Sequence, residues 1–246
     1  NMNCEVPVNS NLVAAYHFNQ GVAGGSNSGV TTLIDAVGNN HPGTLTNFAL
    51  SGATSNWVAS VPIAATRMYR SVASGNWSDP STWETSLGGC WVPASAAPSA
   101  SDSTITIQSG HTVTITNALT IDQTTVASGG TLDITNGNLT ILNGVGSDLT
   151  INGTFNWSNA ASTMTVNTGA VVDGSTNFSY HGTNLINNGY MNLYTVVGGS
   201  TPVTITGTGS IAILLPFTFN AAGIIINGTQ TITNQISFNY GIIHAI

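Results

Sequence analysis

The chain has 246 residues, 41% of them hydrophobic and only 4% charged, and its formal net charge at pH 7 is -7. This apolar content is enough to build one large or two small domains. Arg67 and Arg70 are the only cations apart from histidine, which excludes nucleic acid and anionic membrane surfaces as partners because both need many cations. No apolar run approaches the roughly 20 residues of a spanning helix, so we expect no membrane insertion.

The N-terminal part is predicted to be distinct from the rest. Residues 1–60 are expected to form short strands and turns, and a linker of small residues follows over 61–74. Asp35 and Asn39 lie in an oxygen-rich loop and form a calcium candidate. Calcium takes six to eight oxygen ligands, however, and this loop offers a single carboxylate.

The only cysteines are Cys4 and Cys90. Two thiols in a chain rich in threonine and asparagine favour one disulfide in an oxidising compartment, such as the extracellular space or the cell surface. The alternative is a pair of buried free cysteines.

Residues 75–102 are rich in tryptophan and are predicted to form a cap. Asp79 suits the N-cap of a single helical turn and Pro80 its first residue. Such a turn brings Trp77 and Trp83 close together, and large aromatic side chains can close the open apolar end of a repeat structure. The expected cap residues are Trp77, Asp79, Pro80, Trp83 and Trp91.

From residue 103 to residue 246 one pattern recurs. A triplet with apolar first and third residues is followed by glycine and then by a second apolar pair at alternate positions. The glycines recur about every 20 residues on average, a period typical of repeat architectures. These expected repeat corners are Gly110, Gly130, Gly153, Gly169, Gly189, Gly209 and Gly228.

This repeat defines the predicted fold. A strand with period-two alternation buries one face, and glycine permits a sharp corner with positive φ. A unit of about 20 residues cannot enclose a core alone, whereas stacked units bury a continuous one. The sequence therefore predicts an all-β protein: a right-handed parallel β-solenoid of about seven rungs over 103–246, with an N-terminal strand and turn segment and a tryptophan-rich cap.

The polar residues of the repeat suggest no catalytic arrangement. Asp102 and Asp122 lie one period apart, a spacing that could match the roughly 5 to 10 Å between glycosidase carboxyls. Asp133 and Asp173 lie about two periods apart. Isolated aspartates in such corners more often cap turns. The histidines lack metal-binding spacing, and His111 is predicted to be an exposed turn residue. We therefore expect no catalytic residue, metal or cofactor.

Several stretches resemble modules of surface proteins. GNWSDPSTWE, followed by VP, SDSTITIQSGHTVTI and SGGTLDI, resembles the opening of secreted parallel β-helix modules of Bacteroidetes, similar in style to the eight-glycine domain. The stretch from YHFNQGVAGG to ATSNWV resembles the tail of a laminin-G-like repeat. A complete sandwich of that kind is far longer than this stretch, so the segment is expected to be incomplete or to take strands from a neighbouring subunit.

The resemblance implies export, an extracellular or cell-surface location, and a role in adhesion, surface coating or glycan contact. We expect a non-enzymatic structural or adhesive module that associates end to end into a filament or stalk. Its partners would be further copies of the chain or neighbouring surface-protein modules. The sequence stops at FNYGIIHAI without a polar cap, so either it is cut short there or this end is an interface. An apolar strand with an unpaired edge invites another chain. The candidate assembly residues are Tyr240, Ile242, Ile243 and Ile246.

The alternative function belongs to a different class. A glycan-binding or glycan-cleaving β-helix would use exposed aromatic side chains to stack on sugar rings. The aromatic residues available for this in the repeat are Trp157, Tyr180 and Tyr190.

Overall fold

The computed structural model divides the chain into two compact units, with the first in residues 1–65 plus 88–90 and the second in residues 66–87 plus 91–246. Each unit is considered by itself. The residues described in the structure are 12–16, 20–38, 40–47, 49–51, 67–86, 91–193, 195–198, 201–213, 224–233 and 243–245.

The first unit contains one small sheet. Strands β1 (Thr32–Leu33) and β2 (Gly43–Thr44) pair antiparallel. The buried Asn27 side chain accepts a hydrogen bond from the Val22 backbone N–H at 2.6 Å and donates one to the Val22 carbonyl at 2.8 Å. Side-chain bonds of this kind fix turns that have few ladder hydrogen bonds.

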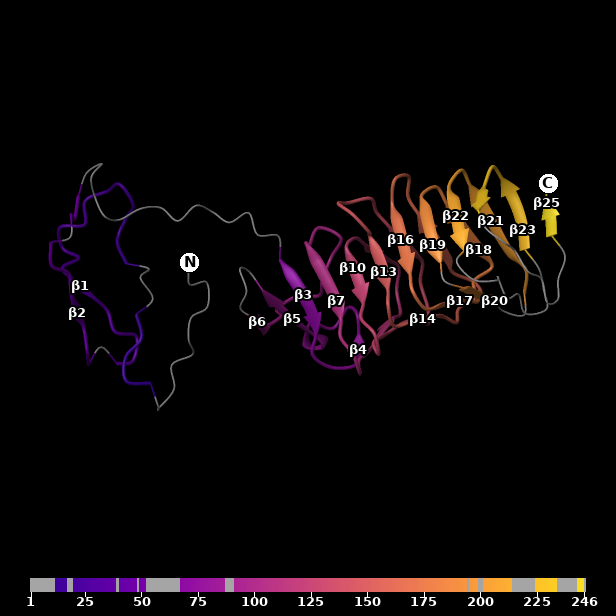
Figure 1. Ribbon diagram of the computed structural model, residues 1–246. Coiled ribbons are helices and arrows are strands. Elements are labelled where there is room, and N and C mark those ends of the chain that lie inside the picture. The colour runs from indigo at the N-terminus through magenta and orange to yellow at the C-terminus, as the bar shows by residue number, and fades with distance from the viewer. Residues whose placement is uncertain are drawn as a thin grey trace. The chain divides into compact units, whose positions relative to one another are not determined.

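The second unit is a parallel β-solenoid built from three sheets (Figure 1). Sheet I contains β3 (Met68–Ser71), β7 (Thr104–Ile107), β10 (Thr124–Val126), β13 (Leu149–Ile151), β16 (Val171–Gly174), β19 (Tyr190–Leu193), β22 (Ser210–Ile213) and β24 (Thr231–Thr233). Sheet II contains β4 (Gly75–Asn76), β8 (Thr112–Ile115), β11 (Thr131–Ile134), β14 (Thr154–Trp157), β17 (Asn177–Tyr180) and β20 (Thr195–Gly198). Sheet III contains β9 (Leu119–Ile121), β12 (Leu139–Ile141), β15 (Thr163–Val166), β18 (Asn184–Asn187), β21 (Val203–Gly207), β23 (Ile224–Gly228) and β25 (Ile243–Ala245).

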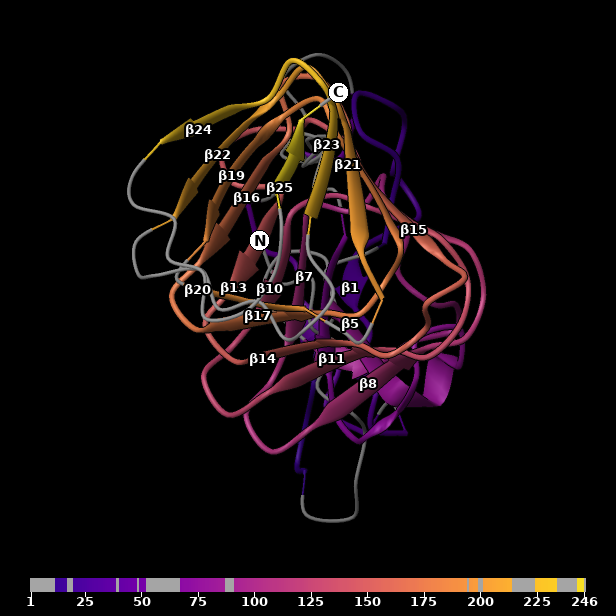
Figure 2. The ribbon, with the colours of Figure 1, turned by 90° about the vertical axis from the view of Figure 1, so that its right-hand side faces the viewer.

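The chain visits sheets I, II and III in order and then starts the next turn. Figure 2 shows the three sheets as separate sides around the core, with β22 and β19 on one side, β8 and β11 on a second, and β21 and β23 on a third. The predicted all-β fold and parallel solenoid are confirmed. About five turns, from β7 to β21, have a described strand in every sheet, rather than the predicted seven.

The predicted repeat glycines belong to two different corners of the turn, because both corners share one local pattern. Gly110, Gly130 and Gly153 lie between sheets I and II, whereas the later repeat glycines lie between sheets III and I. The interval from Gly153 to Gly169, which is shorter than the others, therefore falls within one turn. Local alternation cannot tell one sheet from another, since it records only which side chains point inward.

The corner glycines also differ in why they must be glycine. Gly110 has a φ of 81°, as predicted for a sharp corner. Gly153 has no positive φ, but a Cβ there would lie 2.3 Å from both the Ala127 and the Gly130 carbonyl oxygens of the preceding turn. Gly189 is similar, because its Cβ would lie 2.3 Å from the Ala170 carbonyl oxygen. At these corners the close approach of successive turns excludes a side chain.

The core runs through the middle of the solenoid as in-register columns of apolar side chains. On sheet II, Phe155 stacks on Phe178 with ring centroids 4.5 Å apart and an interplanar angle of 10°. Trp157 lies next to Tyr180 at 5.0 Å. Aromatic stacks in parallel register stabilise adjacent turns beyond the area that they bury.

The solenoid begins earlier in the chain than predicted. Residues 68–71, assigned from the sequence to the linker, form β3, which pairs in parallel with β7 and buries Tyr69. Strands β5 (Trp83–Ser86) and β6 (Trp91–Pro93) extend sheet I beyond β3 in antiparallel pairing. The strand was assigned to the linker because it has only four residues and small residues lie on both sides of it. No described residue belongs to a helix long and apolar enough to cross a membrane.

Candidate functional site

The predicted cap residues lie together at the N-terminal end of the solenoid. Asp79 is the N-cap of a 3-10 turn, η1 (Pro80–Thr82), and accepts a hydrogen bond from the Ser81 backbone N–H at 2.9 Å. This bond is the main reason why the pKa of Asp79 is lowered. The turn places Trp77 and Trp83 side by side with ring centroids 5.0 Å apart.

Both tryptophan indoles are buried and satisfied. The Trp83 Nε1–H donates to the Trp77 carbonyl at 2.9 Å, and the Trp77 Nε1–H donates to the Pro98 carbonyl at 3.1 Å. Trp91 is only half-buried, and the Arg70 guanidinium lies 4.3 Å from the centre of its ring. Arg70 also forms an ion pair with Glu84 at 2.8 Å. The cap therefore fills and seals the first turns of the core.

The carboxylate of Asp35, the calcium candidate, accepts hydrogen bonds from backbone N–H groups. Its Oδ1 accepts hydrogen bonds from the Ala15 and Val37 backbone N–H groups, and its Oδ2 accepts one from the His41 backbone N–H. These bonds, the one from Ala15 most of all, lower the pKa of Asp35, although burial opposes them. N–H donors aimed at a carboxylate take the positions that a cation would need. Asn39 lies outside the described residues, and the described ones contain no metal-binding cluster of three or more ligands.

The carboxylates considered for glycoside cleavage do not form a shared site. Asp133 lies on β11 of sheet II and accepts a hydrogen bond from Asn156, whereas Asp173 lies on β16 of sheet I and accepts bonds from Ser147 and Asn192. The carboxylate of Asp102 accepts bonds from the Ser99 N–H and hydroxyl. Each of these three aspartates organises its own turn or ladder.

Asp122 instead lies beside Asp148, a residue that sequence reasoning missed. Asp148 carried no signal of its own, because it follows a loop of glycine and serine rather than a position of the repeat. Only the stacking of one turn on the next brings the two carboxyl groups together.

His111 was predicted to be exposed, but its Nδ1 lies 2.8 Å from the Ser71 hydroxyl and its ring is half-buried. This Ser–His pair does not have the features of a nucleophilic site. Ser71 is fully buried, and its hydroxyl oxygen accepts a hydrogen bond from the Gln108 backbone N–H. A buried hydroxyl with an occupied lone pair has no path to a substrate. The pair links β3 to the corner that precedes β8.

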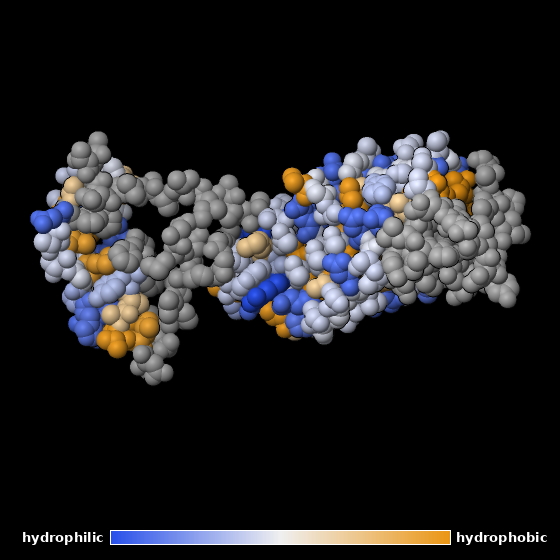
Figure 3. All heavy atoms as spheres, in the orientation of Figure 1, coloured by the Kyte–Doolittle hydropathy of each residue, from blue (hydrophilic) through white to orange (hydrophobic). Residues whose placement is uncertain are grey.

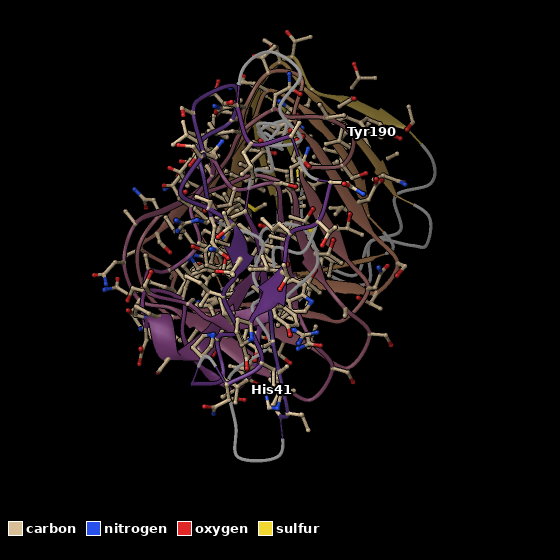
Figure 4. All side chains as sticks on the ribbon, turned by 90° about the vertical axis from the view of Figure 1, so that its left-hand side faces the viewer. His41 and Tyr190 are labelled. Atoms are coloured by element: carbon tan, nitrogen blue, oxygen red, sulfur yellow. The ribbon has the colours of Figure 1, made fainter. Side chains whose placement is uncertain are left out.

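The three aromatic residues of the glycan alternative do not share a surface. Trp157 and Tyr180 are core residues with 0% and 2% exposure, and burial raises the pKa of the Tyr180 phenol. Of the three, only Tyr190 is exposed, at 41%, at the start of strand β19 (Figure 4). The predicted array of sugar-stacking rings is therefore absent from these positions.

The first and last described strands of sheet I differ in the features that protect a sheet edge from pairing. At the N-terminal end the outermost strand is β6, which contains Pro93 and a tryptophan covered by Arg70. At the other end the last described strand is β24, with the sequence Thr231-Ile232-Thr233. Proline and charge protect a sheet edge from pairing, and β24 carries neither.

Other predicted positions are only partly within the described structure. Ile243 begins β25, the last described strand of sheet III. Tyr240, Ile242 and Ile246 lie outside the described residues, as do Cys4 and Cys90, so the disulfide stays a prediction.

These features define the class of protein: a parallel β-solenoid with a tryptophan cap at its N-terminal end. Comparison of the chain with protein-family models, with curated proteins and with solved structures finds no match.

Proposed function

We propose that this protein is a non-enzymatic, extracellular structural module that associates through the β24 end of its solenoid, as part of a surface stalk. The observation that carries the proposal is a contrast within the described strands of sheet I: β6 contains a proline and lies beside a charged side chain, whereas β24 has neither feature. The surface-protein motifs in residues 75–134 support an exported location, and the resemblance to Bacteroidetes modules is part of this proposal.

The surface of the solenoid also supports a structural role. The outward side chains of its strands are mostly threonine, asparagine and serine, and hydrophilic residues cover much of the described face in Figure 3. Repeated hydroxyl and amide groups keep a long solenoid hydrated with few charges. The cap makes a stalk a better expectation than a filament, because a filament needs a partner-binding edge at both ends.

The proposal is tested by charging the edge of β24. Lysine at positions 231 and 233 (Thr231→Lys with Thr233→Lys) places two like charges on each edge strand, which opposes pairing between copies. The matched control is Thr112→Lys with Thr120→Lys, at two exposed positions on strands of sheets II and III.

Sedimentation velocity and negative-stain microscopy give the readouts. The wild type and the control pair are expected to associate with increasing concentration, with particles joined at the solenoid end away from the cap. The edge variant is expected to stay monomeric. Wild-type monomers at every concentration would contradict self-association, and sugar-dependent quenching of tryptophan fluorescence would favour the glycan alternative.

A further inference from the structure

Asp122 and Asp148 form a carboxyl pair at the corner between sheets III and I. Asp122 follows β9, and Asp148 precedes β13 in the next turn. Gly144 touches both residues: its N–H donates to Asp148 Oδ1 at 2.7 Å, and a Cβ built on it would lie 2.4 Å from Asp122 Oδ2. The pair therefore joins two successive turns of the solenoid.

The two carboxyl groups have different surroundings. Asp148 is fully buried, and its Oδ1 and Oδ2 accept backbone hydrogen bonds from Gly144 and Val171 at 2.7 and 2.6 Å. Asp122 Oδ1 is buried without a hydrogen-bond partner among the described residues. A buried carboxylate oxygen without a donor is costly, and a protonated carboxyl reduces that cost.

No described cation is positioned to neutralise the pair. Arg70 is paired with Glu84, and the exposed Arg67 precedes β3 at the same corner two turns away. The nearest other acidic groups along the stack are Asp102, which precedes β7 in the preceding turn, and Asp173, which lies on β16 in the turn after Asp148. Both of them accept hydrogen bonds from their own neighbours.

We propose that Asp122 and Asp148 share one proton, with Asp122 as the donor and Asp148 as the acceptor, and that this proton is a pH-sensitive link between two turns of the solenoid. When the proton leaves Asp122, two carboxylates face each other in a partly buried corner without a counter-ion. The link is then lost, and the loop over 142–148 is the segment that loosens.

The expected pH range follows from the environment of Asp122. Burial first, and then the hydrogen bond and charge of Asp148, raise the pKa of Asp122 to about 6. A group whose pKa is raised in the folded state stabilises the fold below its unfolded pKa, and this contribution is lost as the pH rises through the folded pKa. The link is therefore intact in mild acid and open above about pH 6.

The test compares the wild type with Asp122→Asn in urea denaturation from pH 4 to pH 8. An asparagine keeps the shape and can donate a hydrogen bond to Asp148, but it cannot ionise. Between pH 5 and pH 7, the unfolding constant of the wild type is expected to rise by about tenfold relative to that of the variant. Asp133→Asn is the matched control, since Asp133 faces Asn156 rather than a carboxyl, and it should keep the wild-type pH response.

Carbon-13 NMR of the aspartate carboxyl groups in the wild type tests the same proposal without relying on a variant that folds. A carboxyl titrating near pH 6, absent from Asp122→Asn, supports the shared proton. Exchange protection of the Gly144 and Val171 amides, corrected for intrinsic rates, should fall over the same range. If Asp122 titrates near pH 4, or if the wild type and Asp122→Asn respond equally to pH, the proposal is wrong.

Discussion

At the scale of single residues, the corners of this solenoid depend on how close one turn comes to the next. Gly153 and Gly189 lack a side chain because carbonyl oxygens of the preceding turn occupy the space where a Cβ would be. Gly209 meets the Gly189 carbonyl oxygen in the same way, at 2.3 Å. Adding a methyl group at such a site forces the backbone of two turns apart.

Gly153→Ala tests this explanation. We expect the free energy of unfolding of the solenoid to fall by about 3 kcal/mol, the upper part of the range for overpacking, because the new methyl meets two carbonyl groups. The measurement is urea denaturation followed by tryptophan fluorescence. Ser128→Ala, at an exposed position of the neighbouring corner, is the control and should change stability by less than about 0.5 kcal/mol. Equal effects of the two variants would contradict the steric account.

At the scale of elements, the cap is the part of the solenoid with the most specialised packing. Strand β5 carries the buried Trp83 over the first turn, and the turn η1 brings Trp77 against it. Strand β6 covers the edge of β5 and presents Val92 and Pro93 to solvent. The cap thus closes the core and also ends the sheet.

The two functions of the cap can be separated by substitution. Trp83→Ala removes a fully buried side chain and should destabilise the second unit by about 3 to 5 kcal/mol. Trp91→Ala removes a half-buried ring stacked on Arg70 and should cost only about 1 kcal/mol. Thermal unfolding by circular dichroism measures both. A similar small cost for the two variants would show that Trp83 does not seal the core.

At the scale of the whole molecule, Asp35 in the first unit and Asp122 in the second should make contributions to stability that depend on pH in opposite directions. The lowered pKa of Asp35 means that its contribution to the first unit is present above the usual aspartate pKa and is lost as the pH falls. The raised pKa of Asp122 means that its contribution to the second unit is lost as the pH rises. The two pKa shifts have different causes: backbone N–H donors lower the pKa of Asp35, whereas burial first and then the Asp148 carboxyl group raise the pKa of Asp122.

Hydrogen exchange between pH 3 and pH 7 can follow the units separately. After correction for intrinsic exchange rates, amides of β1 and β2 should lose protection toward pH 3, while amides next to Asp148 should lose it toward pH 7. Asp35→Asn should reduce the acid response of β1 and leave that of β10 unchanged. A common pH response of both units would contradict this assignment.

The sequence by itself determined the class of fold, the direction in which each strand buries its side chains, and the capping turn at Asp79, because period-two alternation and cap chemistry are local properties. The tertiary structure decided the number of turns and the sheet to which each strand belongs. It also decided the burial of Trp157 and the pairing of Asp122 with Asp148. These depend on loops of variable length: the turn from Ile107 to its partner Val126 is shorter than the next one, from Val126 to Ile151. Which residues meet across turns is fixed only when each turn packs on the one before it.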